Sequence, residues 1–527
     1  MSRYNTRNKA KTNKALTHEG GSGYKYDTIQ ELVSLLATGV DNTYYESMID
    51  REDRLTRLIG EAVRERGAEF VAKALVYARA KLGQRSVTHF GAVALVPHLS
   101  GSSIGKYVFS KYNRKAGIGG LVYRLDDILE MVAAYTALNP GKSIPNSMKR
   151  GFKAALEVAD TYELAKYQAK NKNVSLVDVC NLVHPRPAPS MEKVFKDLMT
   201  GNLSQFNTVE DKNTKTGQEV AKKVKAGELT KEQAKEVLSE AKNQNYKELI
   251  TSGKIGYKAL VMNLRNILKD GDSDTISKAV KLLTNKNAIK KSLIQPMEID
   301  VAIEILTIEQ PGTSTTRTRV IGALNKAFEL SIPNMAEVFH GETAVVFDTS
   351  GSMQGGWGGG VSMNIGGQRT RINRSPAEKA ALLAAAFVKG VGADVYHFAS
   401  YCEKISYNPL DTFNTIKKVF MRQNGRVGHG TQFNTIVDKL KASKTRYNRV
   451  IVVSDMQGHD SFKHGHIPGS PYVYSIDMCG YGTTMANPKN PKVFALYGYS
   501  AEMVRVATQM EIDPKALIKE IEAVRLY

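Results

Sequence analysis

Apolar residues recur at helical spacing from Thr28 to about residue 330. Two apolar stripes lie on either side of Gly67, and a later one ends before Asn139-Pro140-Gly141, a sequence that stops helices. Successive amphipathic helices with short breaks are typical of stacked helix pairs. No clean repeat of fixed length is visible, so we expect an irregular, HEAT-like α-solenoid. The two stripes comprise Leu55, Leu58, Ile59, Ala62 and Val63, then Phe70, Val71, Ala74, Leu75 and Ala78.

The pattern changes after about residue 338, where short apolar, β-branched runs alternate with helical stretches. Such alternation predicts a doubly wound, mostly parallel sheet. The fold class is therefore α plus α/β in a multidomain chain, as the length of 527 residues also suggests. The expected strands cover 343–347, 394–398, 449–454, 471–476 and 492–497. The expected helices cover 376–390, 411–422 and 432–442, with a terminal helical region from about 500.

Three regions follow from these patterns. Residues 1–26 are basic, polar and Gly/Ser-containing, which indicates a flexible arm. Residues 27–334 form the helical domain, and residues 338–527 form the α/β domain. Within the helical domain, residues 204–248 are lysine-rich with interleaved glutamates, so a solvated helical hairpin is the expected form.

Polar side chains gather where two expected strands end. The strand 343–347 is followed by Asp-x-Ser-x-Ser, and the strand 449–454 is followed by a second aspartate. A threonine in a glycine-flanked loop can join them, because parallel strands end at one edge of a sheet. Carboxylate and hydroxyl oxygens suit Mg²⁺ or another hard divalent cation and suit zinc or copper poorly. The predicted metal ligands are Asp348, Ser350, Ser352, Thr431 and Asp455.

Other interpretations of these motifs are weaker. Asp-x-Ser-x-Ser alone could be a serine-rich turn, but Thr431 and Asp455 at matching strand ends favour a metal site. The Gly-rich stretch 354–360 lacks the Gly-Lys-Ser/Thr ending of a phosphate-binding loop, so we expect a mobile flap there. Histidines and an aspartate between His459 and His466 could bind metal, but a polar surface loop is favoured.

The net charge of +21 favours polyanionic partners, above all nucleic acid. Solubility alone would explain a smaller charge better. Cys180, Cys402 and Cys479 lack C-x-x-C spacing, which argues against disulfides or structural zinc and for a reducing compartment. The polar N-terminus lacks a secretory h-region, and no apolar run is long enough to span a membrane. We expect a cytoplasmic protein without a membrane partner.

The metal motif and its flanking strands resemble the von Willebrand factor A domain and its metal-ion-dependent adhesion site. The helical region that precedes it, in a basic chain, resembles the Ro autoantigen, or TROVE-domain, family. The resemblance covers about residues 25–527, with departures at Gln295-Pro-Met297, in the Gly-rich flap and in the lysine-rich region. It rests on Asp41-Asn-Thr-Tyr-Tyr45, Lys166–Lys172 followed by Leu176–Pro185, and Tyr257–Leu268.

This resemblance implies a ring of helical repeats closed by the A domain. Single-stranded 3′ ends of structured or misfolded non-coding RNAs would enter its hole, and duplex RNA would lie on a basic outer face. It also implies Y-like RNAs as ligands, a 3′ exonuclease or other protein recruited through the A domain, and a monomeric chain. The expected function is an RNP scaffold in RNA quality control. The implied RNA contacts are Lys149, Arg150, Lys153, Lys166, Lys170, Lys172, His184 and Arg186.

Two other functions compete with RNA binding. A metal-dependent adaptor would grip an acidic side chain of a partner through the open metal position, with only non-specific attraction for RNA. A nuclease would normally cluster carboxylates around two ions. Only Asp348 and Asp455 converge in this sequence, with hydroxyls as the remaining ligands. That set suits one ion in a ligand-binding role, so we expect no enzymatic activity.

Overall fold

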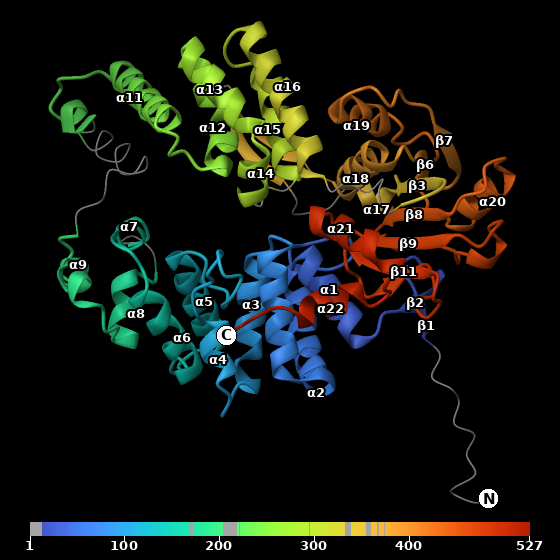
Figure 1. The fold of residues 1–527 in the computed structure, drawn as a ribbon, viewed down its shortest axis with the longest axis horizontal. Helices are drawn as coiled ribbons and strands as arrows, with labels where there is room; N and C mark the ends of the chain where they lie inside the picture. Colours follow the sequence, from blue (N-terminus) through green and yellow to red (C-terminus); the bar gives the residue numbers. More distant parts are fainter. Residues whose placement is uncertain are drawn as a thin grey trace, which may run out of the picture.

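The structure is a computed structural model with a mostly parallel sheet of six strands at one side and many helices that extend away from it (Figure 1). No helix in the described part of the chain is long and apolar enough to cross a membrane. The described residues are 13–168, 173–203, 219–220, 222–292, 294, 296–332, 339–354, 360–365, 368–373 and 375–527.

The sheet has the strand order β11-β9-β8-β3-β6-β7, and its neighbours are parallel except for β6 and β7. The five parallel strands are those expected from the sequence, to within one residue at each end. The antiparallel edge strand β7 was not expected. The strands are β3 (Thr343–Asp348), β6 (Asp394–Phe398), β7 (Cys402–Ile405), β8 (Arg449–Ser454), β9 (Tyr472–Asp477) and β11 (Val493–Tyr497).

Both faces of this sheet are buried, as the doubly wound arrangement requires. Along β3, Val345 and Phe347 face one apolar core, whereas Ala344 and Val346 face another. The first core contains residues of α18 and α21, and the second contains residues of α20. The helices of this domain are α17 (Gly351–Gln354), α18 (Pro376–Val391), α19 (Phe413–Met421), α20 (Asn434–Ala442), α21 (Ala501–Met510) and α22 (Ala516–Glu522).

A first group of helices leads away from the sheet domain, along the lower part of Figure 1. Its apolar core is continuous with one face of the sheet, and α1 packs on β11. The expected break at Gly67 is present, because this residue has φ 84° inside α2. The helices are α1 (Thr28–Thr38), α2 (Met48–Ala80), α3 (Ser86–Leu95), α4 (Ile104–Val108), α5 (Leu125–Leu138), α6 (Asn146–Glu157), α7 (Thr161–Lys166), α8 (Leu176–Val183) and α9 (Glu192–Met199).

A second group of helices has its own core and returns to the sheet domain along the upper part of Figure 1. Its core includes Leu382 and Ala386 of α18, and Phe328 stacks on Phe413 with ring centroids 3.5 Å apart. A closed ring would require residues 204–218, which lie outside the described residues. The helices are α11 (Lys231–Thr251), α12 (Tyr257–Asp270), α13 (Ser273–Leu283), α14 (Lys286–Ser292), α15 (Pro296–Glu309) and α16 (Ser314–Ser331).

Residues 13–25 differ from the flexible arm expected for residues 1–26, of which residues 1–12 lie outside the described residues. Strands β1 (Lys14–Leu16) and β2 (Ser22–Lys25) form a hairpin, and β2 pairs with β10 (Thr483–Thr484) of the sheet domain. Strands this short produce too little apolar alternation to be detected in a sequence. Of the expected lysine-rich hairpin, α11 is helical, and part of the remainder lies outside the described residues, as do residues 355–359 of the expected flap.

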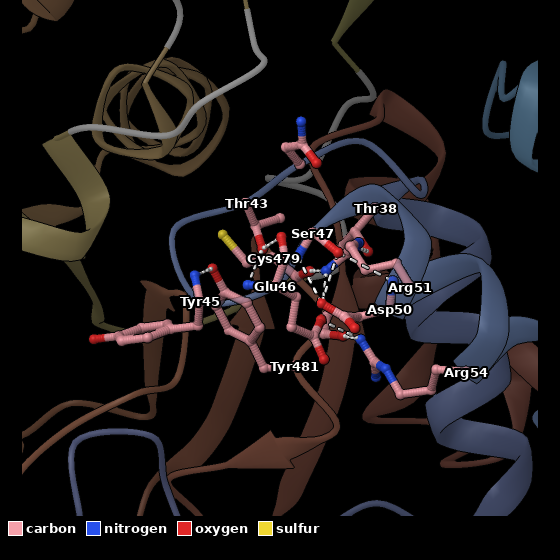
Figure 2. Close-up of polar contacts among 12 residues, drawn as sticks. Thr38, Thr43, Tyr45, Glu46, Ser47, Asp50, Arg51, Arg54, Cys479 and Tyr481 are labelled. Atoms are coloured by element: carbon pink, nitrogen blue, oxygen red, sulfur yellow. Dashed lines mark hydrogen bonds and ion pairs between the residues drawn. The ribbon is translucent and has the colours of Figure 1, made fainter.

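A buried arginine joins the first helical group to the sheet domain (Figure 2). The Arg51 guanidinium donates to the carbonyl oxygens of Cys479 and Gly39, each at 2.7 Å, and pairs with the Glu46 carboxylate at 3.1 Å. Arg54, one helical turn later, donates to Glu46 and to the Gly480 carbonyl, also at 2.7 Å. Removing an acceptor would leave part of a buried charge unsatisfied, which is destabilising.

A buried lysine joins the second helical group to the sheet domain. The Lys417 ammonium of α19 lies 2.8 Å from an Asp300 oxygen of α15 and 3.4 Å from a Glu378 oxygen of α18. Asp300 is 1% exposed and Lys417 is 8% exposed, so water screens this pair weakly. The two helical groups are therefore attached to the sheet domain by separate buried cations.

Replacing Lys417 with methionine should destabilise the protein by about 3–5 kcal/mol, because two carboxylates would remain buried without a cation. Urea unfolding followed by circular dichroism measures this change. Lys278→Met is the matched control, since Lys278 pairs with Asp274 on an exposed surface and should change stability by less than about 1 kcal/mol. Equal losses in the two variants would show that the buried triad does not hold the second group.

Candidate metal centre and basic surface

The carboxyl ends of β3 and β8 bring the two predicted aspartate ligands to one edge of the sheet. Phe347 and Val453 are opposite each other in this parallel pair, so the residues that follow leave the sheet together. Asp348 is the last residue of β3, and Asp455 comes directly after β8. This convergence is a consequence of parallel pairing and is the reason that the sequence could predict it.

Backbone hydrogen bonds tie the three predicted ligand loops into one unit. The Gly351 amide donates to the His429 carbonyl at 2.9 Å, and the His459 amide donates to the Thr431 carbonyl at 2.9 Å. The Ser350 and Ser352 hydroxyl oxygens lie 3.4 Å apart in the first loop. The structure thus places all five predicted ligands at the same edge: Asp348, Ser350, Ser352, Thr431 and Asp455.

The two carboxylates are held by neighbouring groups, although one oxygen is left without a donor. Asp348 accepts hydrogen bonds from the Ser350 amide at 2.8 Å and from the Ser454 hydroxyl at 2.6 Å. One oxygen of Asp455 accepts from the Gln457 amide at 3.0 Å. Its other oxygen, Oδ2, is buried and has no hydrogen-bond partner among the described residues. Ser454 and Gln457, which orient the carboxylates, were not predicted as site residues.

Burial makes the charged form of both carboxyls unfavourable. Asp348 and Asp455 are fully buried, and burial raises the pKa of each above its ordinary value. The negative charge of Asp348 raises the pKa of Asp455 further. A hard cation between them would relieve both effects, because it neutralises the pair and gives Asp455 Oδ2 a partner. The donor set therefore fits a divalent cation.

The histidines after Asp455 do not form a second metal cluster in the described structure. The Asp460 carboxylate accepts the Phe433 and Asn434 amides at 2.7 and 3.1 Å, at the start of α20. His464 bonds the Pro471 carbonyl at 2.8 Å. His459 faces a different segment of the chain, described below. The expectation of a polar loop fits these separate partners.

Two other groups have metal-ligand spacing but already contain cationic side chains. His89, Asp127 and Glu130 lie close together, and Asp127 is bound by Arg85 at 2.8 Å and by Arg79 at 3.3 Å. The second group, Asp300, Glu304 and Glu378, surrounds the Lys417 ammonium described above. These positive charges supply what a metal ion would otherwise supply.

Helix α6 carries three of the predicted RNA contacts. Arg150 is exposed, while Lys149 and Lys153 are half-buried. Glu157, at the end of α6, lies 4.0 Å from the Lys153 ammonium and accepts the Arg186 amide at 2.8 Å. Lys153 and Arg186, which are far apart in the sequence, are therefore neighbours across one carboxylate.

A polar hollow of about 570 Å³ lies at the start of this helix. Arg150 contributes to its wall together with small hydroxyl-bearing residues and the first turn of α6. No side chain caps the amides of that first turn. An arginine, hydroxyls and uncapped helix amides are groups that bind phosphate oxygens. The polar lining includes Ser100, Ser102, Ser103, Asn146 and Ser147.

The remaining predicted contacts are scattered or lie outside the described residues. The Lys166 ammonium is 3.3 Å from the Tyr162 hydroxyl and lies over the rings of Tyr162 and Tyr167. His184 is exposed and ends α8 in a left-handed conformation with φ 47°. Lys170 and Lys172 fall outside the described residues. Of the predicted RNA contacts outside α6, the structure therefore brings only Arg186, among the described residues, next to those of α6.

The chain was also compared with known proteins. No family model matches the chain, and no curated protein matches it. Among solved structures, the chain is similar to the crystal structure of the Deinococcus radiodurans Ro (RSR) protein. The two are 16% identical, the match covers 94% of this chain and 99% of that chain, and the TM-score is 0.48.

Proposed function

We propose that this protein binds structured RNA through the surface formed by α6 and the segment after α8. The observation that carries the proposal is a basic strip along α6, with Arg150 at a polar hollow and with Lys153 and Arg186 beside Glu157 at the end of the helix. The side chains of Lys149, Arg150 and Arg186 form no ion pair with another described residue. They are therefore free to neutralise phosphates, which supply most of the salt-dependent affinity for nucleic acid.

The geometry favours a phosphate backbone as the ligand. Arg150 lies at the hollow, and Arg186 lies beside Glu157 at the end of α6, seven residues further along the helix. Seven residues of helix span about 10 Å, enough to reach more than one phosphate. RNA duplexes are recognised largely through backbone and shape, so such a strip suits structured RNA.

The resemblance to the Ro family supports a finer version of this proposal. In that version, the protein is a monomeric, cytoplasmic RNP scaffold without enzymatic activity that takes part in RNA quality control. It holds Y-like RNAs and misfolded non-coding RNAs with single-stranded 3′ ends, and it recruits a 3′ exonuclease or other protein through the A domain. The basic surface supports RNA as a ligand class, and the motifs of the sequence support the particular RNAs.

We also propose that the edge of the sheet holds one Mg²⁺ or similar hard cation. The unpartnered Asp455 Oδ2 and the buried Asp348–Asp455 pair support this assignment. The cation would supply positive charge between the carboxylates, and the serine and threonine hydroxyls would complete an oxygen shell. Its role here is to order the three loops, because only two of the five predicted ligands are carboxylates, whereas a two-ion nuclease clusters carboxylates around both ions.

RNA binding can be tested with the double variant Arg150→Ala/Arg186→Ala. Both residues are exposed, so the fold should persist while two phosphate contacts are lost. For a structured RNA, the slope of log affinity against log salt should become shallower by about 1.4–1.8. Gel-shift titrations across a salt series, with RNA that carries or lacks a single-stranded 3′ tail, measure this slope.

The charge-matched control is Lys278→Ala/Lys326→Ala, which removes two exposed cations from α13 and α16. It should leave the slope nearly unchanged. If both double variants reduce the slope equally, the attraction comes from net charge and not from the α6 surface. Tail-dependent binding in the wild type would support the single-stranded 3′ end as a ligand.

Metal binding can be tested by calorimetry with Mg²⁺ and Mn²⁺. The wild type should bind one ion, and saturation at about 100 times the dissociation constant should stabilise the fold by about 2.7 kcal/mol. Asp455→Asn should abolish the heat of binding, because it removes the charge of one ligand. Asparagine has nearly the same shape as aspartate, so the contacts of the loop should persist. Asp438→Asn, an exposed change on α20, should bind like the wild type. An ion that binds Asp455→Asn as tightly as the wild type would place the metal elsewhere.

A further inference from the structure

The turn of the N-terminal hairpin lies along the loop that follows Asp455. The Thr17 hydroxyl and the Gly21 amide both donate to the Gly458 carbonyl, at 2.6 and 3.1 Å. The His18 amide donates to the Gln457 side chain at 2.9 Å. A side chain at Gly21 would place its Cβ 2.1 Å from the Gly458 oxygen, so this close approach requires glycine. The contact is therefore a specific docking of the hairpin.

Glu19, at the tip of this turn, brings a carboxylate beside two of the ligand loops. One oxygen of its carboxylate lies 3.3 Å from Nε2 of His459, and its backbone carbonyl lies 3.2 Å from Nδ1 of the same ring. The His459 amide is bonded to the Thr431 carbonyl, and its ring packs over Gly430. Glu19 thus adjoins the loops that carry Thr431 and Asp455.

Tyr45, in the loop between α1 and α2, holds the same carboxylate. Its hydroxyl donates to Glu19. The carboxylate is therefore fixed from two sides, by Tyr45 at one oxygen and by His459 at the other.

Aromatic packing holds Tyr45 in this position. The His18 ring stacks on it with centroids 4.9 Å apart and planes 6° apart, and the Tyr481 ring meets it edge-on at 5.3 Å. Figure 2 shows Tyr45 beside Tyr481, whose hydroxyl accepts the Tyr44 amide at 3.2 Å. The ring is clamped from both the hairpin and the sheet domain, so its hydroxyl has a defined direction.

We propose that the Glu19 carboxylate, positioned by Tyr45, is a built-in ligand of the metal site that closes it to outside partners. This inference rests on the metal site proposed above. It explains why all five loop ligands are 5% exposed or less, although an open adhesion-type site would face solvent. It also brings a third carboxylate to the loops beside Asp455, whose Oδ2 has no described partner.

Two consequences follow from a built-in ligand. Metal binding and docking of the hairpin must strengthen each other by the same factor, because linkage is reciprocal. An acidic side chain from a partner can reach the metal only after Glu19 has left. The A domain in this conformation is therefore closed, and the competing adaptor function requires release of residues 13–25.

The test uses the full-length protein, with hydrogen exchange of residues 13–25 measured in saturating Mg²⁺ and in EDTA. The wild type should show stronger protection of the hairpin with Mg²⁺. Glu19→Gln should lose that metal dependence and bind Mg²⁺ about 10-fold more weakly by calorimetry, because an amide is a poorer ligand than a carboxylate. Tyr45→Phe keeps the ring packing and should weaken Mg²⁺ binding by a smaller factor. Glu61→Gln, a change on α2 outside the site, is the control and should behave like the wild type.

The outcomes separate this inference from the proposed metal site. If the wild type binds Mg²⁺ and Glu19→Gln binds it equally well, with the hairpin indifferent to metal, the built-in ligand is wrong and the metal site stands. If the wild type binds no Mg²⁺ or Mn²⁺, the metal site itself fails. A third outcome is that the hairpin of Glu19→Gln is less protected than that of the wild type by the same amount in Mg²⁺ and in EDTA, so that its metal dependence remains. Glu19 would then act through Tyr45 and His459 alone, which also overturns the inference.

Discussion

The buried guanidinium of Arg51 is the interaction on which the arrangement of this protein depends. Its hydrogen bonds reach the carbonyls of Gly39 and Cys479, so one charge holds the loop between α1 and α2 against the sheet domain. Glu46, at the other end of that loop, also pairs with Arg51. Because a buried charge is costly when any partner is lost, this loop cannot drift without unfolding part of the joint. The same loop carries Tyr45, so the charge network that joins two domains also positions the cover of the metal site.

Both helical groups are consequently attached to the sheet domain. The first helical group is attached through Arg51 near β9, and the second is attached through Lys417 on α19. The metal loop runs directly into α17, which packs on α18, and α18 supplies Glu378 to the Lys417 triad. Contiguous packing therefore connects the first of the proposed metal loops to the second helical group.

The features that could be predicted from the sequence are those that depend on the local pattern of apolar and polar residues. The bounds of β6 and β8 follow from their apolar runs, and the convergence of Asp348 and Asp455 follows from parallel pairing. The spacing of Lys149, Arg150 and Lys153 placed them on one helical face. The cover of the metal site could not be found in this way, because Glu19 and His459 are separated by 440 residues and no periodicity links them. The Asp41–Tyr45 motif was noticed in the sequence, but its role became visible only when the loop was seen against the sheet domain.

If Glu19 covers the proposed metal site, the RNA-scaffold and metal-dependent adaptor functions differ in whether they require the hairpin to be released. A partner that needs the open site binds only the fraction of molecules in which the hairpin has left, so its apparent affinity falls by that fraction. If release of the hairpin costs about 3 kcal/mol, the loss is roughly 150-fold. The RNA binding proposed at Arg150 and Arg186 carries no such penalty, because both side chains are exposed in this conformation. The proposed RNA surface is thus available while the hairpin is docked, whereas recruitment through the proposed metal site would first require Glu19 to be displaced.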